Sequence, residues 1–414
     1  MTQLLINISR KQAMIYAVFL VLYEFLTYIA NDMIMPGMIN VVNSFHGPES
    51  AIATSLTLYV LGGASLQLLL GPISDKHGRR PVMIFGACLF FLCTVFIACS
   101  YSMDQFLLAR FFQGMGLCFI SVVGYATLQE IFAEMEAIRL ISIMANVAIL
   151  APLVGPLLGA LFIYYYNWRM IFVLIGLLAL VALWGLWRFM PESVGQIGRD
   201  GKITDRGSLS FSAVATNYKK LVLNRSFILG SIAMGLIYLP CMAWIALSPI
   251  ILVKTANLTI IQYGLWQLPV FGTFILGNIC LHRMTHYHNV RKLVLIGSVI
   301  ASFSLLFVFI LPMLGGNEFL WLMPGLLVYF FGAGLIGAPL ARYILFCTDV
   351  SKGTASGLMC TISMSAQALG IELGNAMYST HDNIFFGLYC ALSAVIYLIF
   401  LWGSLFNKKE IPSE

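Results

Sequence analysis

The stretch LVLYEFLTYIANDMIMPG, residues 20–37, is mostly apolar but carries two carboxylates, Glu24 and Asp32. The rest of the chain is similarly apolar: of its 414 residues, 60% are hydrophobic and 10% are charged, and the mean hydropathy is +0.92. Soluble globular proteins contain about a quarter charged residues. The composition therefore predicts an integral membrane protein and excludes an ordinary soluble domain.

Apolar windows of about twenty residues, long enough to cross a bilayer as a helix, recur along the chain. We expect twelve spans, at 13–36, 51–70, 82–100, 105–128, 140–165, 170–190, 226–252, 261–281, 291–314, 319–346, 355–378 and 384–406. The long polar segment 191–225 separates the first six from the second six and includes a candidate surface helix near 209–222. The sequence thus predicts an all-α membrane fold with an N-terminal half, 1–190, a cytoplasmic linker, 191–225, and a C-terminal half, 226–414.

Basic residues in short loops concentrate on the cytoplasmic side of a membrane protein. If the N-terminus is cytoplasmic, most lysines and arginines fall in cytoplasmic connections, and only Arg169 and Lys254 lie on the opposite face. We therefore expect both termini in the cytoplasm. The net charge of +6 then reflects topology and gives no indication of nucleic-acid binding.

The cysteines and histidines do not form a convincing metal or redox motif. The nine cysteines lie in apolar runs without a CxxC pair, as expected for small buried side chains. His282, His286 and His288 have spacing that a metal site could use, but they share a basic loop with no cysteine or acidic companion. We expect no metal and no cofactor, and the sequence contains no nucleotide-binding Gly-x-x-x-x-Gly-Lys-Ser/Thr run.

The first span carries a polar stripe. At about 100° per residue, Glu24, Tyr28, Asn31 and Asp32 fall within roughly 80° of one another on a helix. Ionisable side chains inside a bilayer are costly, so this stripe must face protein or a water-filled cavity. Glu24 and Asp32 are therefore candidate proton-binding groups.

Arg110, in the fourth span, is a candidate partner for one of these acids. Asp32 lies near the end of its span and Arg110 near the start of a span that runs the other way, so at about 1.5 Å per residue both lie in the same half of the bilayer. Glu24 lies nearer the midplane and has no evident positive partner. The alternative is that Asp32 and Arg110 only neutralise each other while Glu24 stays protonated and inert.

The loop GPISDKHGRRP, residues 71–81, carries a more specific pattern. A solvated basic hairpin would explain Arg79 and Arg80 alone, but it would not explain Gly71 and Asp75 at their fixed distances from them. This Gly-x-x-x-Asp-x-x-Gly-Arg-Arg pattern resembles the signature between helices two and three of the major facilitator superfamily. The resemblance implies that these residues form a latch that controls conformational change.

Two further motifs resemble the twelve-helix drug/proton antiporter branch of that superfamily. RFFQG, Arg110 to Gly114, is similar to its helix-four motif, and APLVGPLLG, residues 151–159, is similar to its helix-five antiporter motif. The second departs from the pattern at Ala151, where glycine is usual, and keeps Gly155, Pro156 and Gly159. A small residue at Ala151 still permits close helix packing. The alternative is a Gly/Pro-rich packing face without a special role.

The stretch YEFLTYIANDMIMPG resembles the first helix of MdfA-type multidrug and chloramphenicol efflux transporters. The resemblance extends along the chain through GYATLQE, MANVAILAPLVGP, AWIALSPI and SKGTASG. It implies a proton-coupled antiporter of the bacterial inner membrane that exports lipophilic neutral or cationic drugs by alternating access and so confers antibiotic resistance. In that family the two first-helix acids, here Glu24 and Asp32, bind protons and substrate, and the helix-four arginine, here Arg110, is coupled to them.

Substrate and latch contacts can then be placed on the chain. An apolar and aromatic substrate wall would comprise Tyr28, Asn31, Met144, Ala148, Tyr238, Trp244 and Trp266, although side chains of these types are often packing residues. Asp75 and the arginines at 79–80 would meet the start of span eleven near Ser351–Thr354, where free backbone N–H groups favour a carboxylate. The expected partners are a small lipophilic drug or metabolite, protons and the lipid bilayer, with no nucleic acid and with the protein as a monomer.

Rival functions use the same scaffold. A proton-coupled exporter of one endogenous metabolite or siderophore would look the same in sequence, and only substrate assays can separate the two. A proton symporter for uptake is disfavoured by the helix-five motif. An enzyme is disfavoured because no catalytic or metal constellation is present and the loops are too short for a separate domain.

Overall fold

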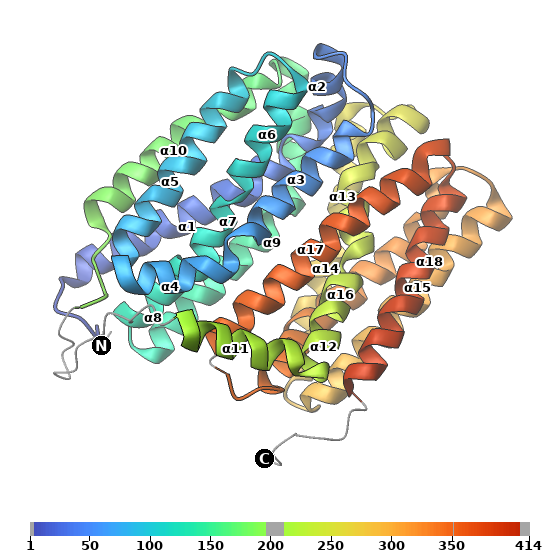
Figure 1. Ribbon diagram of the computed structural model, residues 1–414. Helices are drawn as coiled ribbons and strands as arrows, with labels where there is room; N and C mark the ends of the chain where they lie inside the picture. Colours follow the sequence, from blue (N-terminus) through green and yellow to red (C-terminus); the bar gives the residue numbers. More distant parts are fainter. Residues whose placement is uncertain (1–3, 196–210, 351, 406–414) are drawn as a thin grey trace.

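The computed structural model describes residues 4–195, 211–350 and 352–405, and these are almost entirely helical (Figure 1). The helices of the first part are α1 (Arg10–Asp32), α2 (Met38–Ser44), α3 (Ala51–Ser65), α4 (Gln67–His77), α5 (Arg79–Ala98), α6 (Met103–Gly114), α7 (Gly116–Cys118), α8 (Tyr125–Ile131), α9 (Glu134–Tyr165) and α10 (Arg169–Phe189). Those of the second part are α11 (Phe211–Leu223), α12 (Arg225–Ile237), α13 (Leu239–Ser248), α14 (Ile260–Met284), α15 (Val290–Gly315), α16 (Met323–Phe346), α17 (Lys352–Met377) and α18 (Asn383–Leu405). Short 3-10 or π-helical segments adjoin them: η1 (Met35–Gly37), η2 (Phe119–Gly124), η3 (Pro249–Thr255), η4 (Phe319–Trp321) and η5 (Tyr378–Thr380).

The prediction of an all-helical membrane protein is confirmed, and one expected span differs from the prediction. Ten helical segments in the described ranges are long and apolar enough to cross a membrane, or eleven if the bent pair α3 and α4 forms one span. The expected span at 355–378 corresponds to α17, which is 26 residues long. It is not among those segments because Thr, Ser, Gln, Glu and Asn side chains interrupt its apolar residues.

Helix starts follow from local sequence. Ser9, Ser102 and Asn224 each accept a hydrogen bond from a backbone N–H in the first turn of α1, α6 and α12, respectively. Thr259 and Gln262 form a reciprocal capping box at the start of α14. Such caps satisfy N–H groups that the helix itself leaves without partners.

The helices gather into two groups that lie side by side (Figure 1). In the first, α1 packs against α9 and α10, and α6 packs against α3 and α5. In the second, α15 packs against α16 and α18, and α12 packs against α17 and α18. Contacts between the groups run mainly through α3 with α17 and α9 with α14. The cavity described below is lined by residues of both groups.

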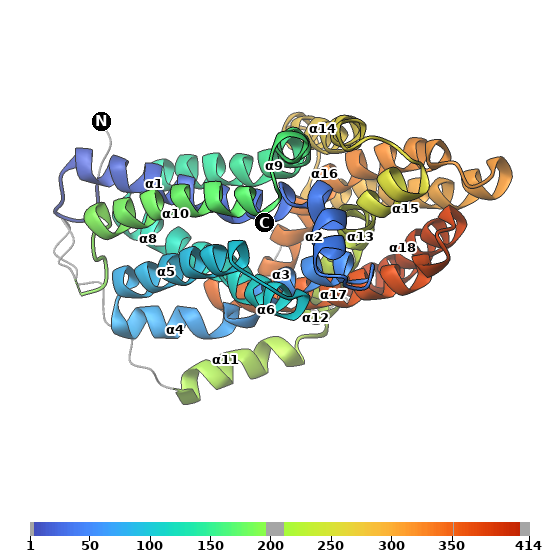
Figure 2. The ribbon, with the colours of Figure 1, turned by 90° about the horizontal axis from the view of Figure 1, so that it is seen from above.

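The expected surface helix is present as α11, Phe211–Leu223. Figure 2 shows it lying along the edge of the molecule, outside the two groups of helices. The Tyr218 hydroxyl donates a hydrogen bond of 3.1 Å to the Leu68 carbonyl in α4. The segment between the two groups thus contacts the first group as well as α12 and α17.

Candidate functional site

Glu24 is buried in α1 although it is ionisable. It is 1% exposed, and its Oε1 accepts a hydrogen bond of 2.8 Å from the Tyr125 hydroxyl of α8. Its Oε2 has no hydrogen-bond partner within the described part of the chain. The expectation that Glu24 lacks a positive partner agrees with this geometry. A carboxylate with one free oxygen can bind a proton or a donor group.

Arg110 is fully buried in α6, and neutral groups surround its guanidinium. It donates hydrogen bonds to the side-chain oxygens of Asn31 at 2.5 Å, Gln113 at 2.8 Å and Ser55 at 3.2 Å. Its guanidinium carbon also lies 4.4 Å from the centre of the Tyr59 ring, close enough for a cation–π contact. These contacts hold the charge in a fixed place without requiring an ionised acid beside it.

Asp32 reaches Arg110 through Asn31. The Asn31 amide nitrogen donates a hydrogen bond of 3.2 Å to Asp32 Oδ1, while its oxygen accepts from Arg110. Among the described residues, none of the ion pairs within 4.0 Å joins Asp32 to Arg110. Helix depth predicted a direct ion pair between Asp32 and Arg110. This prediction is wrong for the described conformation, because the Arg110 guanidinium donates to the side-chain amide of Asn31 instead. Asp32 can change its protonation while Arg110 keeps its hydrogen bonds.

The helix-five motif builds the contact between α9 and α1 beside Asp32. A Cβ added at Gly155 would lie 2.7 Å from the Asp32 Cβ, and one at Gly159 would collide with the Met33 carbonyl oxygen. Ala151, one turn earlier on the same face, is fully buried. The small residues Gly155 and Gly159 let the two helices approach closely. Pro156 lies inside α9 next to this face.

The residues expected to form a substrate wall differ in their surroundings. Tyr28, Ala148 and Tyr238 are half-buried, whereas Asn31, Met144 and Trp244 are buried. The Trp244 indole donates a hydrogen bond of 2.9 Å to Gln267 Oε1, and its ring packs against Phe386. Trp266 packs edge-on against Phe319. In this conformation Trp244 contributes to the packing of α13, α14 and α18.

A cavity of about 540 Å³ lies between the two groups of helices. Gln67, Asp75 and Tyr125 line it from the first group, and Thr354 and Cys360 line it from α17. Tyr125, whose hydroxyl donates to Glu24, is thus also part of the wall of this cavity. Sequence reasoning assigned no role to Tyr125, which lies within the stretch GYATLQE.

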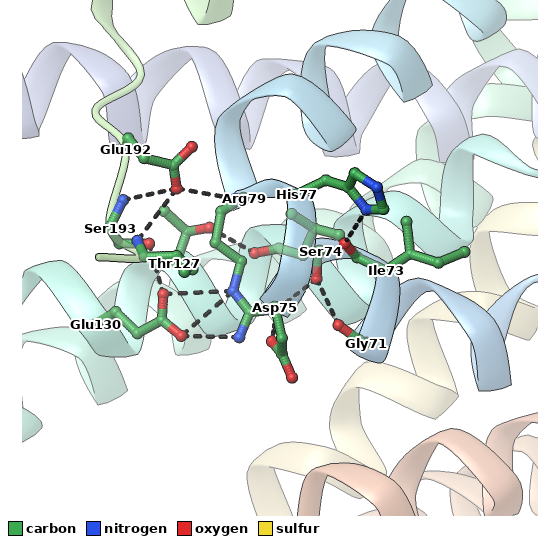
Figure 3. A network of polar contacts seen from close by, with 12 residues as sticks. Gly71, Ile73, Ser74, Asp75, His77, Arg79, Thr127, Glu130, Glu192 and Ser193 are labelled. Atoms are coloured by element: carbon green, nitrogen blue, oxygen red, sulfur yellow. Dashed lines mark hydrogen bonds and ion pairs between the residues drawn. The ribbon is translucent and has the colours of Figure 1, made fainter. Parts of the chain in front are cut away.

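Residues 71–81, expected from sequence to form a loop, are helical except at Gly78, since α4 continues to His77 and α5 begins at Arg79. They form a charged network (Figure 3). Arg79 pairs with Asp75 at 2.7 Å and with Glu130 of α8 at 2.8 Å, and it donates to the Ser74 hydroxyl at 2.5 Å. Gly71 supplies a carbonyl oxygen that accepts from Ser74 and also lines the cavity. Burial of the guanidinium among these acceptors fixes α4, α5 and α8 relative to one another.

Glu192 anchors the start of α5. Its carboxylate accepts from the backbone N–H groups of Arg79 at 2.9 Å and Arg80 at 3.2 Å, where the helix end favours negative charge. The Arg80 side chain donates to the Trp187 carbonyl at 2.7 Å. Sequence reasoning missed Glu130 and Glu192, because their contacts with residues 79–80 join segments more than fifty positions apart.

The expected latch partners face the same cavity. Asp75 lines it from one side, and Gly353 and Thr354, at the start of α17, line it from the other. Ser351, also named in that expectation, lies outside the described residues. The ion pair that Asp75 makes in this conformation is with Arg79 of its own group.

Comparisons with known proteins agree with this architecture. Residues 20–371 match the family described as Major Facilitator Superfamily. The chain is 42% identical over 395 residues to the multidrug transporter MdfA of Yersinia pestis, covering 94% of this chain and 93% of that protein. It is 41% identical over 399 residues to the multidrug transporter MdfA of Escherichia coli O157:H7, covering 96% and 95%.

Solved structures show the same fold at low sequence identity. The xylose transporter XylE from E. coli, in a partially occluded inward-open conformation, has a TM-score of 0.72 at 15% identity, covering 97% of this chain and all of the other. A bacterial homologue of the human lysosomal transporter Spinster has a TM-score of 0.70 at 14% identity, covering 96% and 97%. At these identities the likeness concerns the fold alone.

Proposed function

Because the chain belongs to the major facilitator superfamily, we propose that it is an MdfA-type antiporter that exports lipophilic neutral or cationic drugs in exchange for protons. Its identity of 41–42% over nearly the full length of transporters named for multidrug export supports this proposal. The observation that carries it is the environment of Glu24, which is buried, has one oxygen without a partner among the described residues and accepts a hydrogen bond from Tyr125, a residue that lines the cavity.

Proton and drug compete for the same acids. A protonated Glu24 or Asp32 is neutral and tolerates its buried position, whereas the ionised form is costly unless a positive or donor group approaches. A lipophilic cation or a hydrogen-bond donor supplies such a group. Binding of drug therefore favours proton release, and binding of a proton favours drug release.

Arg110 prepares Asp32 for this exchange. The guanidinium polarises the Asn31 amide, which donates to Asp32, and it remains hydrogen-bonded when Asp32 takes up a proton. The membrane potential adds about 2.3 kcal/mol for each charge that crosses 100 mV. Proton entry can therefore drive export without a nucleotide site.

The geometry also supports a topology for the cycle. We propose twelve spans, with α17 as the eleventh, an N-terminal half at 1–190, a linker at 191–225 and a C-terminal half at 226–414. Both termini are cytoplasmic, and the protein is a monomer in the bacterial inner membrane. The 540 Å³ cavity, lined by the end of α4, the start of α5 and α11, then faces the cytoplasm. The described conformation is inward-facing, and Asp75 meets the start of α17 when this side closes.

Growth and proton measurements test this function. A drug-sensitive bacterial host expressing the chain should gain resistance to chloramphenicol, ethidium and tetraphenylphosphonium together. Purified protein should release protons when any of these compounds is added in weakly buffered detergent solution. Protection against none of them, with normal expression, would refute multidrug export and favour an exporter of one endogenous metabolite or siderophore.

A further inference from the structure

Three charged or titratable side chains meet at the end of the molecule opposite the 540 Å³ cavity. Glu49 lies in the turn before α3, Lys254 lies in η3, and His381 follows η5. The Lys254 ammonium pairs with Glu49 Oε2, and His381 Nε2 lies 3.0 Å from Glu49 Oε1. One carboxylate of the first group of helices thus binds two side chains of the second.

The position of this cluster follows from the helices that lead to it. The cavity is lined by Gln67 and Gly71, after the end of α3, and by Gly353 and Thr354, at the start of α17. Glu49 precedes the start of α3, and His381 follows the end of α17. Since α17 is 26 residues long, its two ends are about 39 Å apart. The cluster therefore lies on the periplasmic side of the proposed topology.

The backbone of His381 is held in an uncommon conformation. Its φ of 55° lies in the left-handed region, which non-glycine residues seldom adopt. The Asn317 amide donates a hydrogen bond of 3.1 Å to the His381 carbonyl, and Asn317 Oδ1 accepts from the Asn383 backbone N–H at 2.6 Å. These contacts fix the turn and direct the imidazole toward Glu49.

The cluster is open to water. A cavity of about 390 Å³ lies beside it, lined by Glu49, Ser50, Ile250, Asn375, Tyr378 and His381 among others. The side chains of Glu49, Lys254 and His381 are 28%, 51% and 41% exposed. Protons from this side of the membrane therefore reach His381 directly.

The electrostatic surroundings of His381 come from several elements. Glu49 faces it from the first group, Lys254 from η3, and the Tyr378 ring lies 5.8 Å away, with Asp382 next in the chain. Burial acts to raise the pKa of Glu49, but hydrogen bonds and charges from Lys254 and His381 outweigh it and leave this pKa below its usual range. Glu49 thus stays ionised near neutral pH, where histidine ordinarily titrates.

We propose that Glu49, Lys254 and His381 form an ionic gate that holds the two halves together on the periplasmic side, and that protonation of His381 tightens it. The proposal rests on the alternating-access function proposed above. A neutral imidazole contributes a hydrogen bond to Glu49, whereas a protonated one adds an attractive charge. Acid in the periplasm then favours the closed periplasmic side, the change that a proton-loaded carrier must make to return inward.

A distance measurement on the full chain tests the gate without any drug. Spin labels at Tyr101→Cys and Leu314→Cys, in a background with the native cysteines replaced, would report the separation of the halves by electron–electron resonance. Both positions are strongly exposed, at 86% and 80%, and follow α5 or end α15 on the periplasmic side. The longer distance marks the open gate.

The expected result distinguishes the contribution of His381 to the pH response from that of the buried acids. From pH 8 to pH 5.5 the ratio of open to closed molecules should fall. In His381→Asn this fall should be about fivefold smaller, which is equivalent to about 1 kcal/mol for an exposed ion pair. Asparagine tolerates the left-handed backbone, so the turn is kept. Glu49→Gln should raise the open fraction at both pH values. His46→Asn is the matched control, since His46 also has a left-handed φ, of 51°.

The outcomes are decisive for the gate. An unchanged pH response in His381→Asn, or an unchanged distance distribution in Glu49→Gln, would overturn it, provided that each variant elutes as a folded monomer. A response lost equally in His46→Asn would also overturn it. Failure of the parent protein to export drugs would refute the proposed function while leaving these drug-free distances interpretable.

Discussion

Replacement of Glu24 by glutamine should separate cationic from neutral substrates. Glutamine keeps the length of the side chain and an oxygen that can accept from Tyr125, which donates at 2.8 Å in the parent protein. The change removes only the negative charge and places an amide where the carboxylate has an oxygen without a partner in the described part of the chain. The variant should therefore insert and fold as the parent protein does.

The size of the effect follows from the charge that is lost. Two opposite unit charges about 6–8 Å apart attract each other by about 2–3 kcal/mol at an effective dielectric constant of about 20, which corresponds to a loss of roughly 30- to 150-fold in affinity. Tetraphenylphosphonium, a cation without hydrogen-bonding groups, should lose affinity within this range. Chloramphenicol is neutral, so its affinity should change by less than about threefold, the weakest contribution of a single hydrogen bond.

Equilibrium binding of both compounds to detergent-purified protein is the direct assay. Glu372→Gln is the matched control, because Glu372 is a half-buried carboxylate of α17 that also has an oxygen without a partner among the described residues. It lies outside the stripe of α1 and should leave both affinities unchanged. Equal losses for the two compounds in Glu24→Gln, or no loss for tetraphenylphosphonium, would refute the assignment of Glu24 to cation binding.

Other substitutions test the remaining parts of the site. Asp32→Asn should preserve insertion but abolish drug-induced proton release from purified protein, and release of the parent size would show that another group carries the proton. Arg110→Ala should abolish resistance at normal expression, because it leaves the side-chain oxygens of Asn31, Gln113 and Ser55 without this buried donor. The control is Arg188→Ala, which replaces an exposed arginine. Resistance retained in Arg110→Ala would remove Arg110 from the mechanism. Asp75→Asn should slow transport in proteoliposomes while drug affinity stays within about twofold, and lost binding with normal insertion would contradict a latch role.

Much of the helical architecture could be predicted from local patterns in the sequence. Apolar windows located the helices because a bilayer requires every backbone polar group to be paired within its own segment, which makes the length and hydropathy of each span readable from the sequence. The polar residues of the first span were recognisable for the same reason, since each one is costly there. The exception was α17, which is less clearly apolar than the other expected spans because it carries several polar residues. This helix packs against α3 and α12.

The pairing of side chains across helices was decided by the tertiary structure. Helix depth placed Asp32 and Arg110 at a similar level in the bilayer. It could not show that the guanidinium of Arg110 would instead donate a hydrogen bond to Asn31, 79 positions away in the sequence. The contacts of Glu130 with Arg79 and of Glu49 with His381 join residues 51 and 332 positions apart. Such contacts depend on how the helices rotate and how closely they approach, and small residues such as Gly155 set that approach. The sequence by itself therefore determined which residues enter the membrane, while packing between distant helices determined which of them meet.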